Sequence, residues 1–151
     1  MNRSERAAQA FVDGYNCAQA VAVAFADLMG MDEKTAARLA APFGGGMGRL
    51  REVCGAVSGM LLVLGSLYGY DDPKADAEKK QLYQEVQDLA AGFREQFGTI
   101  LCRELLDNPS SSPNPTPRTP AFYQDRPCAR FVAAAAEEME HFIAAHPLEN
   151  R

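Results

Sequence analysis

Residues 53–69 read VCGAVSGMLLVLGSLYG and contain no charged side chain. If this stretch is helical, apolar and small residues lie on every side of it, which is typical of a helix buried all round. Gly55 and Gly59 are four residues apart and share one side of the helix, where a neighbouring backbone can come close. The stretch therefore predicts a central helix with a smooth face that begins beside Cys54.

Apolar residues recur three and four positions apart on both sides of this stretch, which is the spacing of amphipathic helices. No segment alternates polar and apolar residues for long enough to indicate a β-strand. Besides the central helix, the pattern predicts helices over residues 4–12, 17–29, 33–42, 74–97 and 100–106, and a last one from about residue 128. We predict an all-α fold with one domain over residues 1–151, a bundle of about six helices around the buried central helix.

Prolines mark two boundaries in the second half of the chain. Asp72 followed by Pro73 predicts a helix start, with Asp72 as the cap and Pro73 at the first helical position. Residues 108–126 hold repeated prolines among serines and threonines, so we predict a surface loop without a helix. A loop of this length favours a functional lid or a segment that wraps the surface or a partner, and simple disorder is the equal alternative.

The charge of the chain argues against two classes of partner. Its net charge is -5 and its basic residues are dispersed, so neither nucleic acid nor an anionic membrane surface is expected to bind. The charged start of the chain is followed by no pure apolar run, and the run from Met60 onward is too short and too rich in glycine to span a bilayer. We predict a cytoplasmic protein, and its apolar content and long amphipathic helices suggest a homodimer.

Cys17, Cys54, Cys102 and Cys128 each belong to a different predicted helix. The cytoplasm keeps thiols reduced, so a structural disulfide framework is not expected. Capping signals assign Cys17, Cys102 and Cys128 to first helical turns, and Cys54 stands near a helix start. The unpaired N–H groups of a helix N-terminus favour thiolate over thiol and lower the pKa. The four thiols are therefore predicted to ionise readily.

Arginines neighbour two of these cysteines. Arg103 follows Cys102, and Arg126 and Arg130 flank Cys128. A cation that points toward a thiol lowers its pKa further, whereas an exposed arginine has no effect. The sequence leaves both alternatives open.

The cysteine pattern also resembles a known family. Cys54-Gly55-Ala56-Val57-Ser58-Gly59, with the Asn16–Val21 segment before it and Cys102 and Cys128 after it, is similar to the redox-active protein family named for the pattern C_GCAxxG_C_C. The resemblance runs from about Gly14 to the last helix. It implies a redox role for the four cysteines and brings no substrate with it.

The first hypothesis for function is thiol redox chemistry, in which cysteine pairs cycle between dithiol and disulfide. All four cysteines are candidate catalytic residues, with Cys54 as the attacking thiol. Its supporting residues on the smooth face are Gly55, Ala56, Ser58 and Gly59. Chain order suggests Cys17 with Cys54 and Cys102 with Cys128, out of three connectivities. This would be a thiol/disulfide oxidoreductase with an unknown redox partner or thiol substrate, and the absence of Cys-x-x-Cys argues against thioredoxin-like machinery.

Two alternatives remain. The four cysteines could hold an iron–sulfur cluster or a zinc ion, although no two of them have the close spacing typical of such ligands. His141 and His146 are five residues apart and do not share a helix face, so they are not expected to join a metal site. We therefore predict no cofactor. In the other alternative the chain is a structural α-helical oligomer whose cysteines are inert core residues.

Overall fold

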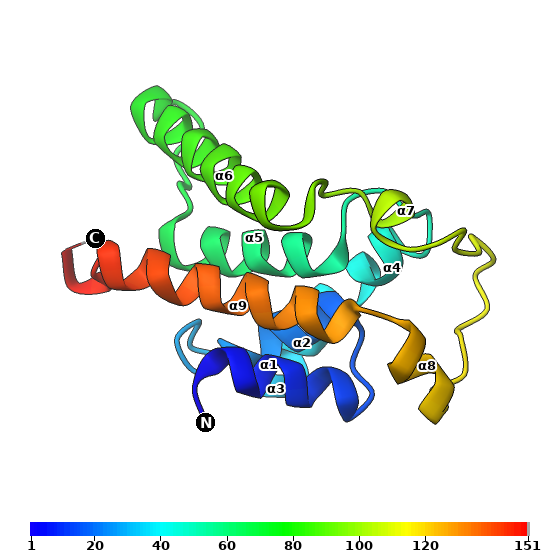
Figure 1. Cartoon of the computed structure of the whole chain (residues 1–151). Helices are drawn as coiled ribbons and strands as arrows, with labels where there is room; N and C mark the ends of the chain where they lie inside the picture. Colours follow the sequence, from blue (N-terminus) through cyan, green and yellow to red (C-terminus); the bar gives the residue numbers. More distant parts are fainter. Residues whose placement is uncertain (151) are drawn as a thin grey trace.

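The computed structural model describes residues 1–150, and its fold is all-α (Figure 1). The predicted fold class is confirmed, since within these residues the single β-type pairing is an isolated bridge between Val53 and Leu101. In chain order the elements are α1 (Arg3–Val12), α2 (Cys17–Ala24), α3 (Glu33–Ala40), the 3-10 turn η1 (Ala41–Phe43), α4 (Gly44–Met47), α5 (Gly55–Tyr68), α6 (Asp76–Phe97), α7 (Cys102–Leu105), α8 (Pro120–Asp125), α9 (Cys128–Ala145) and the 3-10 turn η2 (Leu148–Asn150).

The uncharged stretch of residues 53–69 forms α5, which packs against α2 and α9. Figure 1 shows α5 and α9 side by side across the middle of the molecule, with α6 on one side of the pair and α1, α2 and α3 on the other. Val57, Met60 and Val63 of α5 are fully buried, as expected for a central helix. The main buried cluster joins them to side chains of α1, α2 and α9.

The two glycines of α5 form a seam against the start of α2. A Cβ atom on Gly59 would stand 2.7 Å from the carbonyl oxygen of Ala18, closer than real Cβ contacts. A Cβ atom on Gly55 would stand 3.2 Å from the sulfur of Cys17. The smooth face predicted from sequence is thus the surface on which the chain around Cys17 rests.

Gly59→Ala is therefore expected to lower the free energy of unfolding by about 1–3 kcal/mol, because the added methyl group meets backbone that cannot move aside alone. Gly65→Ala is the matched control on the same helix. Nothing lies within 4 Å of its added Cβ, so the better helix propensity of alanine should raise stability by up to about 1 kcal/mol. Urea unfolding of both variants measures these changes. Equal free energies of unfolding for the two variants would contradict the close contact between Gly59 and α2.

Several predicted helix boundaries are wrong. The helix expected over residues 100–106 is α7, which begins at Cys102, and the helix expected over residues 33–42 ends at Ala40. The helix expected to run through residue 29 ends at Ala24, and turns follow it up to Gly30. The helix expected from residue 74 begins at Asp76. Asp72 caps the turn ahead of it instead, since its carboxylate accepts a hydrogen bond of 2.9 Å from the N–H of Lys74.

The expectation that residues 108–126 hold no helix is also wrong, because α8 lies within them. The Thr119 side chain caps α8 by accepting a hydrogen bond of 3.2 Å from the N–H of Phe122. Pro120 is the first residue of the helix, where a missing N–H removes no helical hydrogen bond. Pro120 thus starts a helix, whereas the prolines of residues 108–126 were interpreted only as helix breakers.

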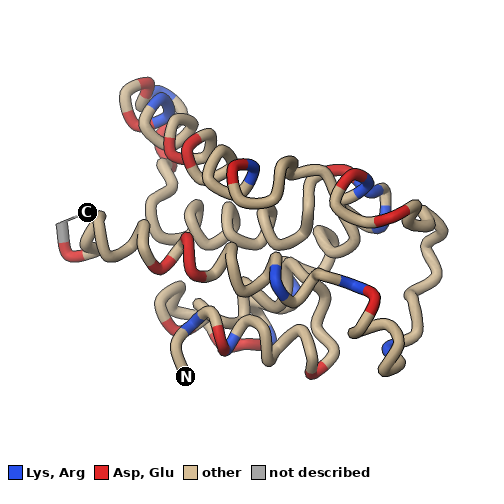
Figure 2. The backbone as a smooth tube through the Cα atoms, viewed as in Figure 1, with Lys and Arg blue, Asp and Glu red and all other residues tan. Residues whose placement is uncertain are grey.

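The longest helix, α6, presents acidic and basic positions along its length (Figure 2). Leu89 and Phe93 on its other side are buried, which agrees with the predicted amphipathic pattern. Glu85 departs from that pattern, since it is only 7% exposed. No helix within residues 1–150 has both the length and the apolar character needed to cross a membrane.

Candidate functional site

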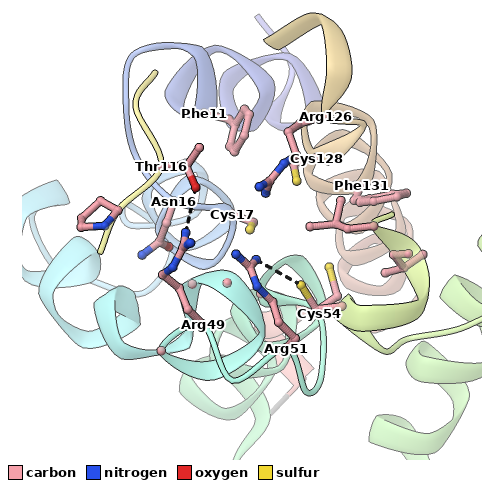
Figure 3. Close-up of a pocket in the computed structure, with 18 of the residues that line it drawn as sticks. Phe11, Asn16, Cys17, Arg49, Arg51, Cys54, Thr116, Arg126, Cys128 and Phe131 are labelled. Carbon is pink, nitrogen blue, oxygen red and sulfur yellow. Dashed lines mark hydrogen bonds between the residues drawn. The ribbon is translucent and has the colours of Figure 1, made fainter. Parts of the chain in front are cut away.

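A cavity of about 320 Å³ lies where four helices begin, and all four cysteines line it (Figure 3). Cys17, Cys102 and Cys128 are the first residues of α2, α7 and α9, and Cys54 is the residue before α5. Their predicted placement at helix starts is confirmed. The fold thus brings together thiols that are far apart in the sequence.

Cys17 is held in place from several sides. Asn16 caps α2, and its side chain accepts a hydrogen bond of 2.9 Å from the N–H of Gln19. The Gln19 side chain in turn accepts one of 3.1 Å from the N–H of Asn16, which completes the predicted capping box. Gly44 lies so close to the Asn16 side chain that no larger residue fits there, and Gly55 lies against the Cys17 sulfur. The Cys17 side chain remains partly exposed.

Cys17 and Cys128 share a hydrogen bond with opposite effects on the two thiols. The bond donated by the Cys128 thiol lowers the pKa of Cys17 to about 6, against burial, which alone would raise it. The backbone N–H of Gly45 and the charge of Arg118 lower it further. The same hydrogen bond, together with burial, raises the pKa of Cys128. These shifts favour the thiolate form of Cys17 and the protonated form of Cys128.

Cys54 and Cys102 each directly follow a residue of the antiparallel bridge between Val53 and Leu101. The N–H of Cys54 donates to the carbonyl oxygen of Ile100, and the N–H of Cys102 donates to that of Glu52, both at 2.7 Å. Burial raises the pKa of Cys54 to about 12, and the charge of Cys17 adds to the shift. Burial also raises the pKa of Cys102. The expectation that helix starts make these thiols acidic thus holds for Cys17 alone, and the pKa of Cys54 argues against its predicted role as the attacking thiol.

The glycine-rich segment before α5 is a left-handed turn. Met47, Arg49 and Arg51 have φ angles of 71, 68 and 62°, in a region that costs a residue with a side chain roughly 1–2 kcal/mol. The turn is closed by hydrogen bonds from the N–H of Arg51 to Gly45 O at 3.2 Å and from Glu52 to Gly46 O at 2.9 Å. Figure 3 shows the outcome, since Arg49 and Arg51 both reach the cavity.

These two arginines attach the proline-rich segment to the cavity rim. Arg51 Nε donates to the carbonyl oxygen of Ser110 at 2.8 Å, and Arg49 Nε donates to that of Ser112 at 2.6 Å. Arg49 Nη1 also donates to the hydroxyl of Thr116 at 3.0 Å. The proline-rich segment, for which the sequence left open a lid, a segment that wraps the surface or a partner, and disorder, therefore forms a wall of the cavity.

Sequence reasoning identified one of the arginines at the cavity and missed three. Of the two alternatives left open for Arg126, the structure shows the one in which it points toward the thiol, since it lines the cavity with Cys128. Arg103 is half exposed and pairs with Glu52 at 2.9 Å, and Arg130 is exposed and does not line the cavity. The missed residues are Arg49, Arg51 and Arg118. For Arg49 and Arg51 the only signal in the sequence was the glycine run, which indicates unusual backbone without giving its direction. Arg118 lies in the proline-rich segment, where no pattern singled it out.

The residues predicted to support Cys54 divide into two groups. Gly55 lines the cavity, whereas Ala56, Ser58 and Gly59 do not. The N–H of Ala56 lowers the pKa of Cys54 slightly, but burial outweighs it. Across residues 1–150, no three His, Cys, Asp or Glu side chains are grouped so that they could hold a metal ion.

The fold and the cavity define a class: an all-α protein with four cysteine thiols around one pocket, one of them acidic. Residues 15–142 match the sequence model of the family described as "Putative redox-active protein (C_GCAxxG_C_C)". This chain belongs to that family, because the match covers most of its length, and the resemblance stated from the cysteine motif is confirmed. No curated protein and no solved structure matches the chain.

Proposed function

We propose that this protein is a thiol/disulfide oxidoreductase in which Cys17 is the attacking thiol and Cys128 the resolving thiol. The observation that carries the proposal is that both thiols line the same cavity, with Cys17 partly exposed and Cys128 buried. Their interaction lowers the pKa of Cys17 to about 6 and raises that of Cys128. An acidic, partly exposed thiol beside a second thiol is an arrangement that favours disulfide exchange. The redox role of the family supports the same chemistry.

In the first step the Cys17 thiolate attacks one sulfur of a disulfide R–S–S–R. A bond forms between Cys17 and that sulfur, the R–S–S–R bond breaks, and RS⁻ leaves and takes a proton from solvent. In the second step Cys128 loses its proton and attacks the Cys17 sulfur. The Cys17–Cys128 bond forms and the second RS⁻ leaves with that proton. Two electrons pass from the dithiol to the substrate.

The order of these steps follows from the charge on Cys17. While Cys17 is a thiolate, its hydrogen bond and its charge both raise the pKa of Cys128. Once Cys17 is part of a mixed disulfide its charge is gone, so both effects vanish and Cys128 deprotonates more easily. Formation of the mixed disulfide thus activates the resolving thiol.

Intact mass of protein purified without air, before and after mild oxidation, tests this proposal. The bare chain mass should fall by two hydrogens on oxidation, and digestion should recover a peptide pair joined through Cys17 and Cys128. Cys54→Ser is the matched control and should form the same disulfide. A first disulfide between Cys17 and Cys54, as chain order suggested, would overturn the assignment. A mass increased by zinc, or by iron with sulfide, would instead make the cysteines a ligand set.

A further inference from the structure

The cavity carries an excess of positive charge. Four guanidinium groups line it, and no Asp or Glu side chain of residues 1–150 does so. The arginines are Arg49, Arg51, Arg118 and Arg126. The Cys17 thiolate supplies one negative charge, which leaves the surplus uncompensated by the protein.

Arg51 is the most unusual of the four, since it is only 4% exposed. Its Nε donates to Ser110 O at 2.8 Å and its Nη1 to the Cys102 sulfur at 3.6 Å. Its Nη2 is buried and has no hydrogen-bond partner. Buried donors, above all charged ones, are nearly always paired, so this nitrogen lacks an acceptor. Figure 3 shows the guanidinium directed into the cavity toward Cys17.

Two features around Arg51 are unfavourable in the absence of a ligand: its backbone conformation and the repulsion among neighbouring arginines. The backbone of Arg51 is in the left-handed region, which side chains rarely adopt. Burial lowers the pKa of Arg49, and repulsion from the charges of Arg51 and Arg126 lowers it further. An anion in the cavity would relieve the repulsion and supply the missing acceptor. Backbone strain at a binding site is a common sign of such a role.

We infer that the cavity binds the carboxylate of a small anionic disulfide, with Arg51 Nη2 as its hydrogen-bond donor and Cys17 beside the scissile bond. The inference rests on the proposed function and names the substrate class. A guanidinium with a free N–H suits a planar carboxylate, and a cavity of about 320 Å³ is in the size range of small-molecule sites. The disulfide is reduced by the two steps given above, and two carboxylate-bearing thiols leave.

Rates with three small disulfides test the charge preference. The substrates are 3,3′-dithiodipropionate, which is a dianion, the neutral bis(2-hydroxyethyl) disulfide, and the dication cystamine, each rate divided by that of free 2-mercaptoethanol at the same pH. The dianion is expected to react about 10-fold faster than the neutral disulfide, as one charged hydrogen bond allows. Cystamine should be the slowest. Equal corrected rates would overturn the inference.

Variants assign the preference to the cavity. Arg51→Met should reduce the preference for the dianion to about 1-fold, and Arg126→Gln should reduce it in part. The second variant is included because Arg126 is partly exposed and can be replaced with less risk to folding. Arg103→Met is the matched control, because it removes a positive charge next to Cys102 outside the cavity. A ratio unchanged in both cavity variants, or lowered equally by Arg103→Met, would contradict the assignment.

Binding without chemistry separates this inference from the proposed function. Titration calorimetry of the reduced wild-type protein with 3,3′-thiodipropionate, a thioether that cannot be reduced, should give binding that weakens with salt, is weakened in Arg126→Gln and is lost in Arg51→Met. If this dianion binds but no disulfide cycle exists, the site stands and the proposed function fails. If the cycle runs but the dianion does not bind, the inference fails. Binding of inorganic phosphate alone would also overturn the disulfide assignment, because the ligand would then be a free oxyanion.

Discussion

Alkylation of the reduced protein by iodoacetamide is expected to occur first at Cys17, with a rate that rises through a midpoint at about pH 6. Only the thiolate reacts, so the rate is low below this pH and reaches its plateau by pH 7 to 8. Cys54, whose pKa is about 12, should remain a thiol across this range and react far more slowly. Peptide mapping after short exposures at each pH measures both rates.

Two substitutions of Cys128 test the cause of the low pKa. Cys128→Ala removes the hydrogen-bond donor, so the midpoint should move up toward the ordinary cysteine value of about 8.5. Cys128→Ser keeps a hydroxyl donor and should retain most of the shift. A wild-type midpoint near the ordinary value, or the same midpoint in both variants, would contradict the role of this hydrogen bond.

Local sequence signals predicted the fold well. Uncharged residues between Val53 and Gly69 predicted α5, and Gly55 with Gly59 predicted the seam that the start of α2 fills. The capping box of Asn16 and Gln19 predicted the start of α2. These features depend on residues a few positions apart, where helical geometry fixes their relation.

The chemistry of the site depended on long-range contacts that local patterns do not contain. Cys17 of α2 and Cys128 of α9 line the same cavity, and their interaction contributes most to the opposite pKa shifts of the two thiols. The sequence interpretation chose Cys54 from its smooth helix face, but burial outweighs the helix start there. Arg51 was missed because no residue pattern indicates a left-handed backbone at an arginine. The cytoplasmic location, the homodimer and the single domain stay predictions.

The second large effect is expected when the resolving thiol is removed. In wild type, a mixed disulfide between Cys17 and a small disulfide substrate should be short-lived, because the neighbouring Cys128 attacks it. In Cys128→Ser the first step should keep nearly its full rate, since the hydroxyl still stabilises the Cys17 thiolate, but the second step has no nucleophile. The mixed disulfide should then persist with a lifetime about 100-fold longer or more, as expected when an intramolecular step is lost.

Quenching with acid at timed intervals and measuring intact mass follows this adduct directly. Cys102→Ser is the matched control, because that thiol lines the same cavity but hydrogen-bonds to Arg51, so its adduct should resolve at the wild-type rate. Together with the alkylation result, the two Cys128 variants separate the two roles of this residue: alanine removes both activation and resolution, and serine removes resolution alone. Rapid loss of the adduct in Cys128→Ser, with persistence in Cys54→Ser, would identify Cys54 as the resolving thiol and return the pairing to the one that chain order suggested.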